Sequence, residues 1–329
     1  MYPDRAVDSQ GRGRVLGARS APKKQRQPAK GSAGYQGQSP WLVLAVLVIF
    51  WSLPAHAQID LSGLWTPVSR NQDGSGMTGD AAGVPLTREG QWRAQSWSPE
   101  DFDVAEWVCR PHAFDYSLEG PRSWLRFWPE VHEPTQQLIA YHGHIEMMGQ
   151  RSTIWMDGRP HPPANSVHTW SGFSTGVWDG DVLVVTTTHL KETYIRRSGL
   201  MRSDQATVRT RWRKIGDYLQ ATSILYDPVY LAEPYARSTM MWRHDPAMVL
   251  PPYPCEEATE TAVPRGRTPH FLPGRSPLPG LNPKVTDRFG TPYEPRLGGP
   301  DTMYPEYIGK MKTFPRPATI ATDATEGGP

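Results

Sequence analysis

The chain has 329 residues, two cysteines and a formal net charge of +2. Eight of its 35 basic and two of its 33 acidic residues precede Gln58, so the chain from Gln58 on carries 27 basic and 31 acidic residues, a net charge of −4. This balance argues against nucleic acid as a partner, because affinity for it depends on phosphate neutralisation by Lys and Arg.

The first 57 residues have the pattern of a secretory signal peptide. A basic stretch over 1–40 is followed by an apolar run over 41–53 and by Ala55-His56-Ala57, a small-x-small cleavage signal. The apolar run is shorter than the roughly 20 residues that a membrane span needs. We therefore expect cleavage before Gln58, a periplasmic or secreted protein, and no stable membrane span after cleavage.

The segment 58–122 predicts a first strand and covering helices. Leu61 to Trp65 has a strand-like pattern, and Gly63-x-Trp65 resembles the opening motif of lipocalins. Thr87 is suited to cap a helix that runs to Trp97, and Ser98-Pro99-Glu100 has the cap, proline and acid that begin a second helix.

From Ser123 to Glu257 the chain predicts the strands of a barrel. Asp179-Gly180 suits a type I′ turn between two strand-like runs. In 206–213, Arg and Thr alternate with apolar residues, as in a half-buried strand. The expected strands are 123–128, 137–146, 151–156, 170–178, 181–189, 206–213, 218–226 and 236–242. Because closure removes exposed edges, we predict an all-β, antiparallel, up-and-down, lipocalin-like barrel with short flanking helices and an extended C-terminal tail.

The connections between these strands alternate in length. The short ones are Met147–Gln150, Asp179-Gly180 and Lys214–Asp217, and the long ones are 157–169, 190–205 and 227–235. In an up-and-down barrel, alternate connections lie at opposite ends. We therefore expect all three long loops at one mouth, where binding and catalytic groups concentrate.

The remaining features are the cysteines and the tail. Cys109 and Cys255 would form a disulfide in an oxidising compartment, tying the segment before the barrel to the segment after it. Residues 251–329 hold 16 of the 34 prolines, so 258–329 predicts an extended or disordered tail. The tail could wrap the barrel or join a homo-oligomer.

Three motifs in the hairpin region resemble a family of secreted bacterial proteins. They are Asp157-Gly158-Arg159-Pro160-His161-Pro162, then Thr169-Trp170-Ser171-Gly172, then Gly176-Val177-Trp178-Asp179-Gly180-Asp181-Val182-Leu183-Val184-Val185. The family signature is DGRxHP, TWxG and GxWxGDxLVV, and the match covers about Leu61 to Glu257. The resemblance implies a lipocalin-like barrel and assigns no catalytic residue. The plainer alternative for Arg159 and His161 is a loop held together by an ion pair.

The predicted mouth collects titratable groups. The candidate catalytic residues are Lys191, Tyr194, His168, His189 and Asp227, and the candidate ligand-binding residues are Arg159, His161, Trp170, Arg196 and Tyr230. Burial would lower the lysine pKa toward a useful value for a general base, and Arg196 could bind an anion. The alternatives are a solvated charged loop and, for Asp227-Pro228, ordinary turn chemistry.

A metal site is the weaker hypothesis for strand 137–146. His142, His144 and Glu146 share one face of this strand, with a spacing that a metal could use. The opposite face carries Tyr141 and Ile145. If that face points into the core, the histidines point outward.

Two functions from different classes follow. The first is a periplasmic or secreted enzyme without a cofactor, a lyase, isomerase or hydrolase that uses acid–base chemistry on an aromatic or hydrophobic small molecule. The second is a non-catalytic carrier or sensor of the same kind of ligand. The usual motifs for hydride, phosphoryl and serine-type acyl transfer do not occur. The number of titratable groups at one mouth favours the enzyme.

Overall fold

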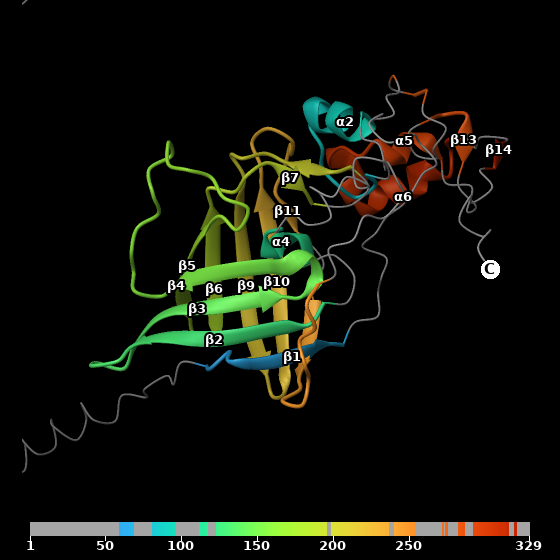
Figure 1. Cartoon of the computed structure of the whole chain (residues 1–329). Helices are drawn as coiled ribbons and strands as arrows, with labels where there is room; N and C mark the ends of the chain where they lie inside the picture. Colours follow the sequence, from blue (N-terminus) through green and yellow to red (C-terminus); the bar gives the residue numbers. More distant parts are fainter. Residues whose placement is uncertain are drawn as a thin grey trace, which may run out of the picture. The chain divides into compact units, whose positions relative to one another are not determined.

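Nine strands close into a β-barrel in the computed structural model (Figure 1). Around the ring the order is β1-β2-β3-β4-β5-β6-β9-β10-β12, and β12 pairs back to β1. The all-β barrel predicted from the sequence is confirmed. Its strands are β1 (Gly63–Pro67), β2 (Leu125–His132), β3 (Gln137–Ile145), β4 (Gln150–Trp155), β5 (Phe173–Asp179), β6 (Val182–Thr188), β9 (Thr207–Ile215), β10 (Tyr218–Tyr226) and β12 (Met240–His244).

The structure describes only part of the chain, all of it within the unit from His56 to Pro329. The described residues are 59–68, 81–96, 112–117, 123–195, 199–236, 240–253, 272, 274–275, 282–286, 292–315 and 319–320. The predicted signal peptide, the second helix at Ser98, and both cysteines lie outside them. No helix in the described ranges is long and apolar enough to cross a membrane.

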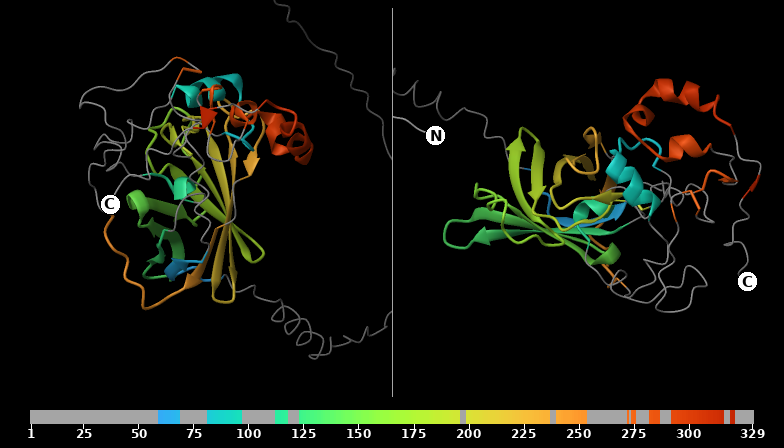
Figure 2. Two further views of the ribbon diagram at one scale, coloured as in Figure 1. Left: turned by 90° about the vertical axis from the view of Figure 1, so that its right-hand side faces the viewer. Right: turned by 90° about the horizontal axis from the view of Figure 1, so that it is seen from above.

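Short elements accompany the barrel. They are α2 (Arg88–Gln95), α4 (Phe114–Ser117), η3 (Met147–Gly149), β7 (Thr193–Tyr194), β8 (Met201–Arg202), β11 (Tyr235–Ala236), β13 (Val285–Thr286), α5 (Tyr293–Arg296), η4 (Pro300–Met303), α6 (Pro305–Met311) and β14 (Thr319–Ile320). Thr87 caps α2 as predicted, since its hydroxyl accepts a hydrogen bond from the Gly90 amide at 3.1 Å. The helix lies beside the loop that follows β10, where the Thr87 amide donates to the Tyr230 carbonyl (Figure 2).

The β5–β6 hairpin has a turn one residue later than the sequence predicts. Asp179 pairs with Val182, which leaves Gly180-Asp181 as the two-residue loop. Of these two, Gly180 has the positive φ, at 61°, which is the pattern of a type II′ turn rather than type I′. Gly216 repeats the pattern in the β9–β10 turn, with a φ of 57°.

One neighbouring pair of strands is parallel. β4 and β5 pair through Ile154 with Ser174 and Trp155 with Thr175. The number of strands requires such a pair, because directions cannot alternate all the way round a ring of nine. The connection from Met156 to Gly172 therefore starts at one end of the barrel and finishes at the other.

This crossover corrects the predicted grouping of loops. We call the end with the Gly180-Asp181 and Gly216-Asp217 turns the turn end, and the opposite end the loop end. The loops after β6 and β10 share the loop end, as predicted. The loop 157–169 begins instead at the turn end. The short Met147–Gln150 connection lies at the loop end, where Met147 packs with Tyr194, Tyr116 and Met201.

Aromatic side chains fill the barrel interior. Trp65, Trp212 and Trp242 are fully buried, and Phe127 packs edge-on against Trp212 with ring centroids 5.1 Å apart. The alternation predicted for 206–213 is confirmed: Val208, Thr210 and Trp212 face inward, and Arg209, Arg211 and Arg213 are exposed. Large apolar side chains of the described strands thus occupy the barrel interior, as in barrels of about this strand number.

The C-terminal segment is partly helical. Residues 292–315 form α5, η4 and α6 where the proline content predicts extended chain, and Pro305 occupies the first turn of α6, a position that a helix tolerates. The Ala81 amide donates to the Arg296 carbonyl at 2.7 Å, which ties α5 to the segment before α2.

Candidate functional site

Asp227 organises the loop end. Its carboxylate is 4% exposed and accepts hydrogen bonds from the Ser203 amide at 2.6 Å and the Ser203 hydroxyl at 2.7 Å. The amides of Val229 and Tyr230 donate to the same carboxylate at 2.9 and 3.2 Å. The group that the sequence suggested as a general acid therefore joins two loops, and both of its oxygens are occupied by protein donors.

Lys191 and Tyr194 do not share a cavity. Lys191 is exposed, with its amino group 4.8 Å from the centre of the Trp170 ring. Tyr194 is 2% exposed and packs with Tyr116 and Met201. Neither residue lines the two cavities described below, and Arg196 lies outside the described residues. Lys191 and Tyr194 thus lie in different surroundings, and their catalytic roles stay predictions.

Tyr230 lies at the outside of this end. Its hydroxyl donates to the Glu192 carboxylate at 3.3 Å. Burial, and then the charge of Glu192, raise the pKa of Tyr230 above its ordinary value. A raised pKa makes this phenol a weaker proton donor at neutral pH.

A buried ion pair holds α4 against the loop end. Arg202 Nε donates to Asp115 Oδ2 at 2.8 Å, and the two side chains are 0% and 3% exposed. A second guanidinium nitrogen donates to the Lys191 carbonyl at 2.8 Å. The sequence does not reveal this pair, because its members lie 87 positions apart and no local pattern links them.

A small polar cavity lies under α4. Its volume is about 20 Å³, about the size of one water molecule. Among the hydroxyl groups that line it, Ser174 pairs with Thr187 at 2.8 Å, and Thr210 pairs at 2.8 Å with Ser223, which lies outside the lining. This interior space is too small for an organic ligand.

The loop 157–172 is fixed to β5 and β6 by a chain of hydrogen bonds. His189 Nε2 lies 2.9 Å from the Pro163 carbonyl, which can only accept, so Nε2 carries the proton. In the neutral ring Nδ1 then accepts from the Thr188 hydroxyl at 2.8 Å. That hydroxyl accepts in turn from His161 Nδ1 at 2.7 Å, and His161 Nε2 accepts from the Thr175 hydroxyl at 2.8 Å.

This chain explains two features of its histidines. His189 has a left-handed backbone, with a φ of 55°, which the flanking hydrogen bonds maintain. Burial, and then the neighbouring His189, lower the pKa of His161 below its ordinary value. Both rings therefore connect the loop to the barrel wall through hydrogen bonds.

The two ends of the β5–β6 hairpin meet through backbone hydrogen bonds. The Thr169 amide donates to the His189 carbonyl and the Lys191 amide donates to the Thr169 carbonyl, each at 2.9 Å. His168 Nδ1 lies 3.0 Å from the Leu190 carbonyl, and its ring centre is 5.2 Å from that of His189. Backbone pairing and hydrogen bonds thus account for the position of His168.

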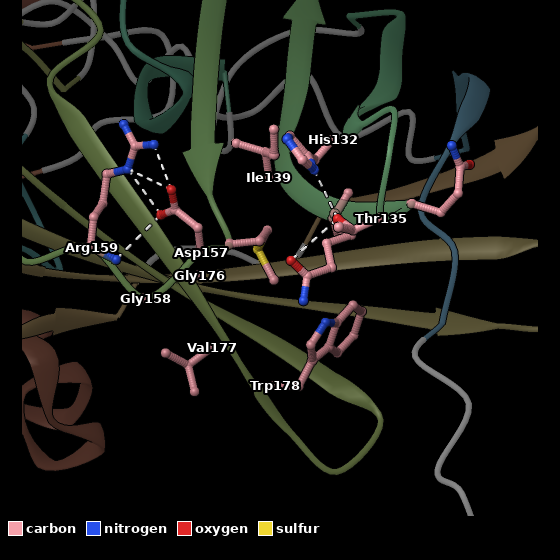
Figure 3. A pocket seen from close by; sticks show the side chains of 13 residues that line it. His132, Thr135, Ile139, Asp157, Gly158, Arg159, Gly176, Val177 and Trp178 are labelled. Carbon is pink, nitrogen blue, oxygen red and sulfur yellow. Dashed lines mark hydrogen bonds and ion pairs between the residues drawn. The ribbon is translucent and has the colours of Figure 1, made fainter.

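A large cleft lies at the turn end, away from the predicted mouth. Strand β4 ends at Trp155, so the first residues of β3 and the last residues of β5 have no strand between them. The gap in the wall is a cavity of about 1100 Å³ (Figure 3). Its lining residues are His132, Thr135–Ile139, Met156–Arg159 and Gly176–Trp178.

Apolar side chains of both strands line this cleft. Leu138, Met156 and Trp178 are partly buried and pack against the barrel core. Gly176 makes room for Met156, since a Cβ at position 176 would lie 2.5 Å from the Met156 sulfur. The indole nitrogen of Trp178 is shielded from solvent and has no hydrogen-bond partner in the described part of the chain.

Polar side chains form the rim on opposite sides (Figure 3). On one side, Arg159 donates from Nε to both oxygens of Asp157, at 2.9 and 3.0 Å, and its guanidinium lies 3.5 Å from the centre of the Trp155 ring. These hydrogen bonds lower the pKa of Asp157. On the other side, His132 Nδ1 lies 2.9 Å from the Thr135 hydroxyl. The ion pair that the sequence offered as the plainer explanation of Arg159 is present.

The outer face of β3 does not assemble a metal site. Tyr141 and Ile145 face the core, so His142 and His144 point outward. His142 is 2.7 Å from the Glu130 carboxylate and 3.1 Å from the Thr153 hydroxyl. The described residues contain no cluster of three His, Cys, Asp or Glu side chains that could hold a metal ion.

No protein-family model, curated protein or solved structure matches the chain. The resemblance to a family of secreted bacterial proteins therefore stays a prediction.

Proposed function

We propose that the protein binds an amphipathic small molecule in the turn-end cleft, as a carrier or sensor. The observation that carries this proposal is the size and lining of the cleft. At about 1100 Å³ it is as large as typical ligand pockets, and an apolar floor between polar rims is their usual composition. The ligand would place an aromatic or hydrophobic body against Met156 and Trp178.

The polar residues of the rim would orient the bound ligand. Hydrogen-bonding groups of the ligand would meet Gln136, Gln137 and the Asp157–Arg159 pair. The Trp178 indole nitrogen is a further donor for a ligand oxygen after a small movement of the side chains above it. Leaving such a donor unpaired costs about 1–3 kcal/mol, which a ligand acceptor would recover.

The acid–base enzyme stays a prediction. The surroundings of its candidate catalytic residues support catalysis less than the cleft supports ligand binding. Asp227 is held by four protein donors, and Lys191 and Tyr194 lie in different surroundings. In the cleft, the lowered pKa of Asp157 keeps this carboxyl ionised and makes it a poor proton donor at neutral pH. Export to the periplasm or the exterior is part of the same proposal, based on the predicted leader.

A charged rim variant tests the proposal without disturbing the core. Val177 lines the cleft and is 68% exposed, so Val177→Lys should fold normally. Val249 is 83% exposed and lies outside the cleft lining, which makes Val249→Lys a matched control. The probes would be 1-anilinonaphthalene-8-sulfonate and a panel of lignin-type aromatic acids, titrated by fluorescence and calorimetry.

We expect Val177→Lys to weaken binding about tenfold, equivalent to 1.4 kcal/mol, and Val249→Lys to leave it unchanged. Mass spectrometry of the recovered probe separates the two functions. An unchanged probe supports a carrier or sensor, and a product whose formation is lost in Val177→Lys supports an enzyme. Equal affinity in both variants, or no binding by any probe, would reject the cleft as the site.

A further inference from the structure

The outer wall of the barrel carries a row of basic side chains. The strand registers align Arg126 of β2 with His144 of β3, and His144 with Arg151 of β4. Both arginines are exposed, because their neighbours on the same strands, Leu125 and Ser152, face inward. Three basic groups thus lie side by side on one face.

The two guanidinium groups lie close to the central imidazole. Burial is the largest cause that lowers the pKa of His144, and the positive charges of Arg151 and Arg126 add to it. Adjacent strands are about 4.8 Å apart, so the Cα atoms of the two arginines are separated by about 10 Å. Both long side chains can therefore reach one anion placed above His144.

No acidic side chain in the described part of the chain pairs with the arginines of this row. Neither Arg126 nor Arg151 forms an ion pair within the described ranges. Glu130 is engaged by His142 at 2.7 Å, and Glu146, two residues beyond His144, pairs with neither arginine. Three other exposed arginines, Arg211, Arg213 and Arg159, pair with Asp179, Asp181 and Asp157. Arg209 and Arg243 are exposed and have no ion pair in the described ranges, but neither lies in this row.

Two exposed indoles flank the row on the same face. Trp124 and Trp128 lie two residues before and after Arg126, and each is 36% exposed. The Trp128 ring is stacked on His142, with ring centroids 5.5 Å apart, and the Arg126 guanidinium is 5.1 Å from its centroid. Aromatic groups beside a cationic row suit a ligand that combines anionic groups with rings.

We propose that the outer face of β2, β3 and β4 binds an anionic carbohydrate chain, with a carboxylate or sulfate between Arg126 and Arg151 and sugar rings against Trp124 and Trp128. A nucleic acid fits less well, because a row about 10 Å long meets few phosphates and the chain from Gln58 on has a net negative charge. This site is separate from the turn-end cleft and does not depend on the ligand bound there.

Titration of the full chain with four probes tests this inference. The probes are hexagalacturonate for carboxylates, a heparin-derived hexasaccharide for sulfates, maltohexaose as a neutral sugar, and a short duplex DNA. The variant Arg126→Gln/Arg151→Gln removes two charges from the row. The control Arg209→Gln/Arg243→Gln also removes two exposed charges, from β9 and β12. Arg209 pairs with Ile224 and Arg243 pairs with Tyr218, at opposite ends of β10.

We expect one or both anionic sugars to bind, at least tenfold weaker binding in the row variant, and no change in the control or in Val177→Lys. Which anionic sugar binds better identifies the anionic group. Equal losses in both double variants would show unspecific charge attraction and overturn the proposal. Binding of maltohexaose with equal affinity, tighter binding of DNA, or no binding of either anionic sugar would also overturn it.

Discussion

The two ends of the barrel differ in how their polar groups are used. At the loop end, Asp227, His189 and the Asp115–Arg202 pair are each bound by other protein groups. At the turn end, the short hairpins have few loop backbone groups that need hydrogen-bond partners. The gap beside β4 forms an open cleft there with an apolar floor. The predicted catalytic groups at the loop end are thus engaged by protein partners, whereas the cleft at the turn end is open.

This difference shows what a concentration of titratable residues in loops can mean. Long loops expose many backbone amides and carbonyls, and buried ones must find hydrogen-bond partners. Asp227 accepts from three amides, and Arg202 donates to a carbonyl. Such residues are explained by loop structure before any chemistry is needed, whereas the cleft has space that no protein group fills.

The largest expected loss of stability concerns the buried ion pair at the loop end. Arg202→Met removes one partner and leaves the Asp115 carboxylate buried, which typically destabilises a protein by about 3–5 kcal/mol. Urea unfolding would measure the loss, with exposed Arg209→Met as a control that should stay within about 0.5 kcal/mol. A loss below about 1 kcal/mol in Arg202→Met would mean that the loop end does not depend on this pair.

Asp227→Asn should have the next largest effect. Asparagine keeps one acceptor oxygen, but its amide nitrogen cannot accept from the Ser203 amide, so we expect a loss of about 2 kcal/mol. The control is Asp204→Asn, an exposed change in the same loop. Unchanged stability in Asp227→Asn, together with lost turnover of a substrate, would return Asp227 to the role of general acid.

The sequence predicted local features well and long-range ones poorly. The predicted strand 218–226 coincides with β10. Its start follows a glycine turn, and its length follows from an alternating pattern of side chains. The end at which Met147–Gln150 lies depends on the number of strands in the closed ring, which turn length does not reveal. Asp227 was predicted as a catalytic residue with turn chemistry as the alternative, and its partners in the Ser203 loop come from another part of the chain.

The cleft was missed for a related reason. It results from a strand that stops early, since β4 pairs with β5 through two residue pairs before the chain leaves the wall. Arg159 is the one candidate binding residue from the sequence that lines it. Gly176 contributes as well, because its lack of a side chain leaves room for Met156.

The smallest expected effect concerns pH and the hydrogen-bond chain that fixes the loop 157–172. Because the pKa of His161 is lowered in the folded protein, the unfolded chain binds a proton there at higher pH. The contribution of His161 to stability is therefore complete above its unfolded pKa, near 6.5, and is lost as the pH falls below it.

His161→Asn removes this titration and should reduce the fall in Tm between pH 7.5 and 5.5 by about 1 °C, a small change because the ring is partly exposed to solvent. Part of the fall should persist, since the pKa of His144 is lowered in the same direction. Calorimetric scans would measure the change, with His132→Asn on the exposed β2–β3 hairpin as the control. The same pH dependence in wild type and His161→Asn would show that protonation of His161 is not coupled to folding, and the loop would then be held mainly by its backbone pairing at Thr169.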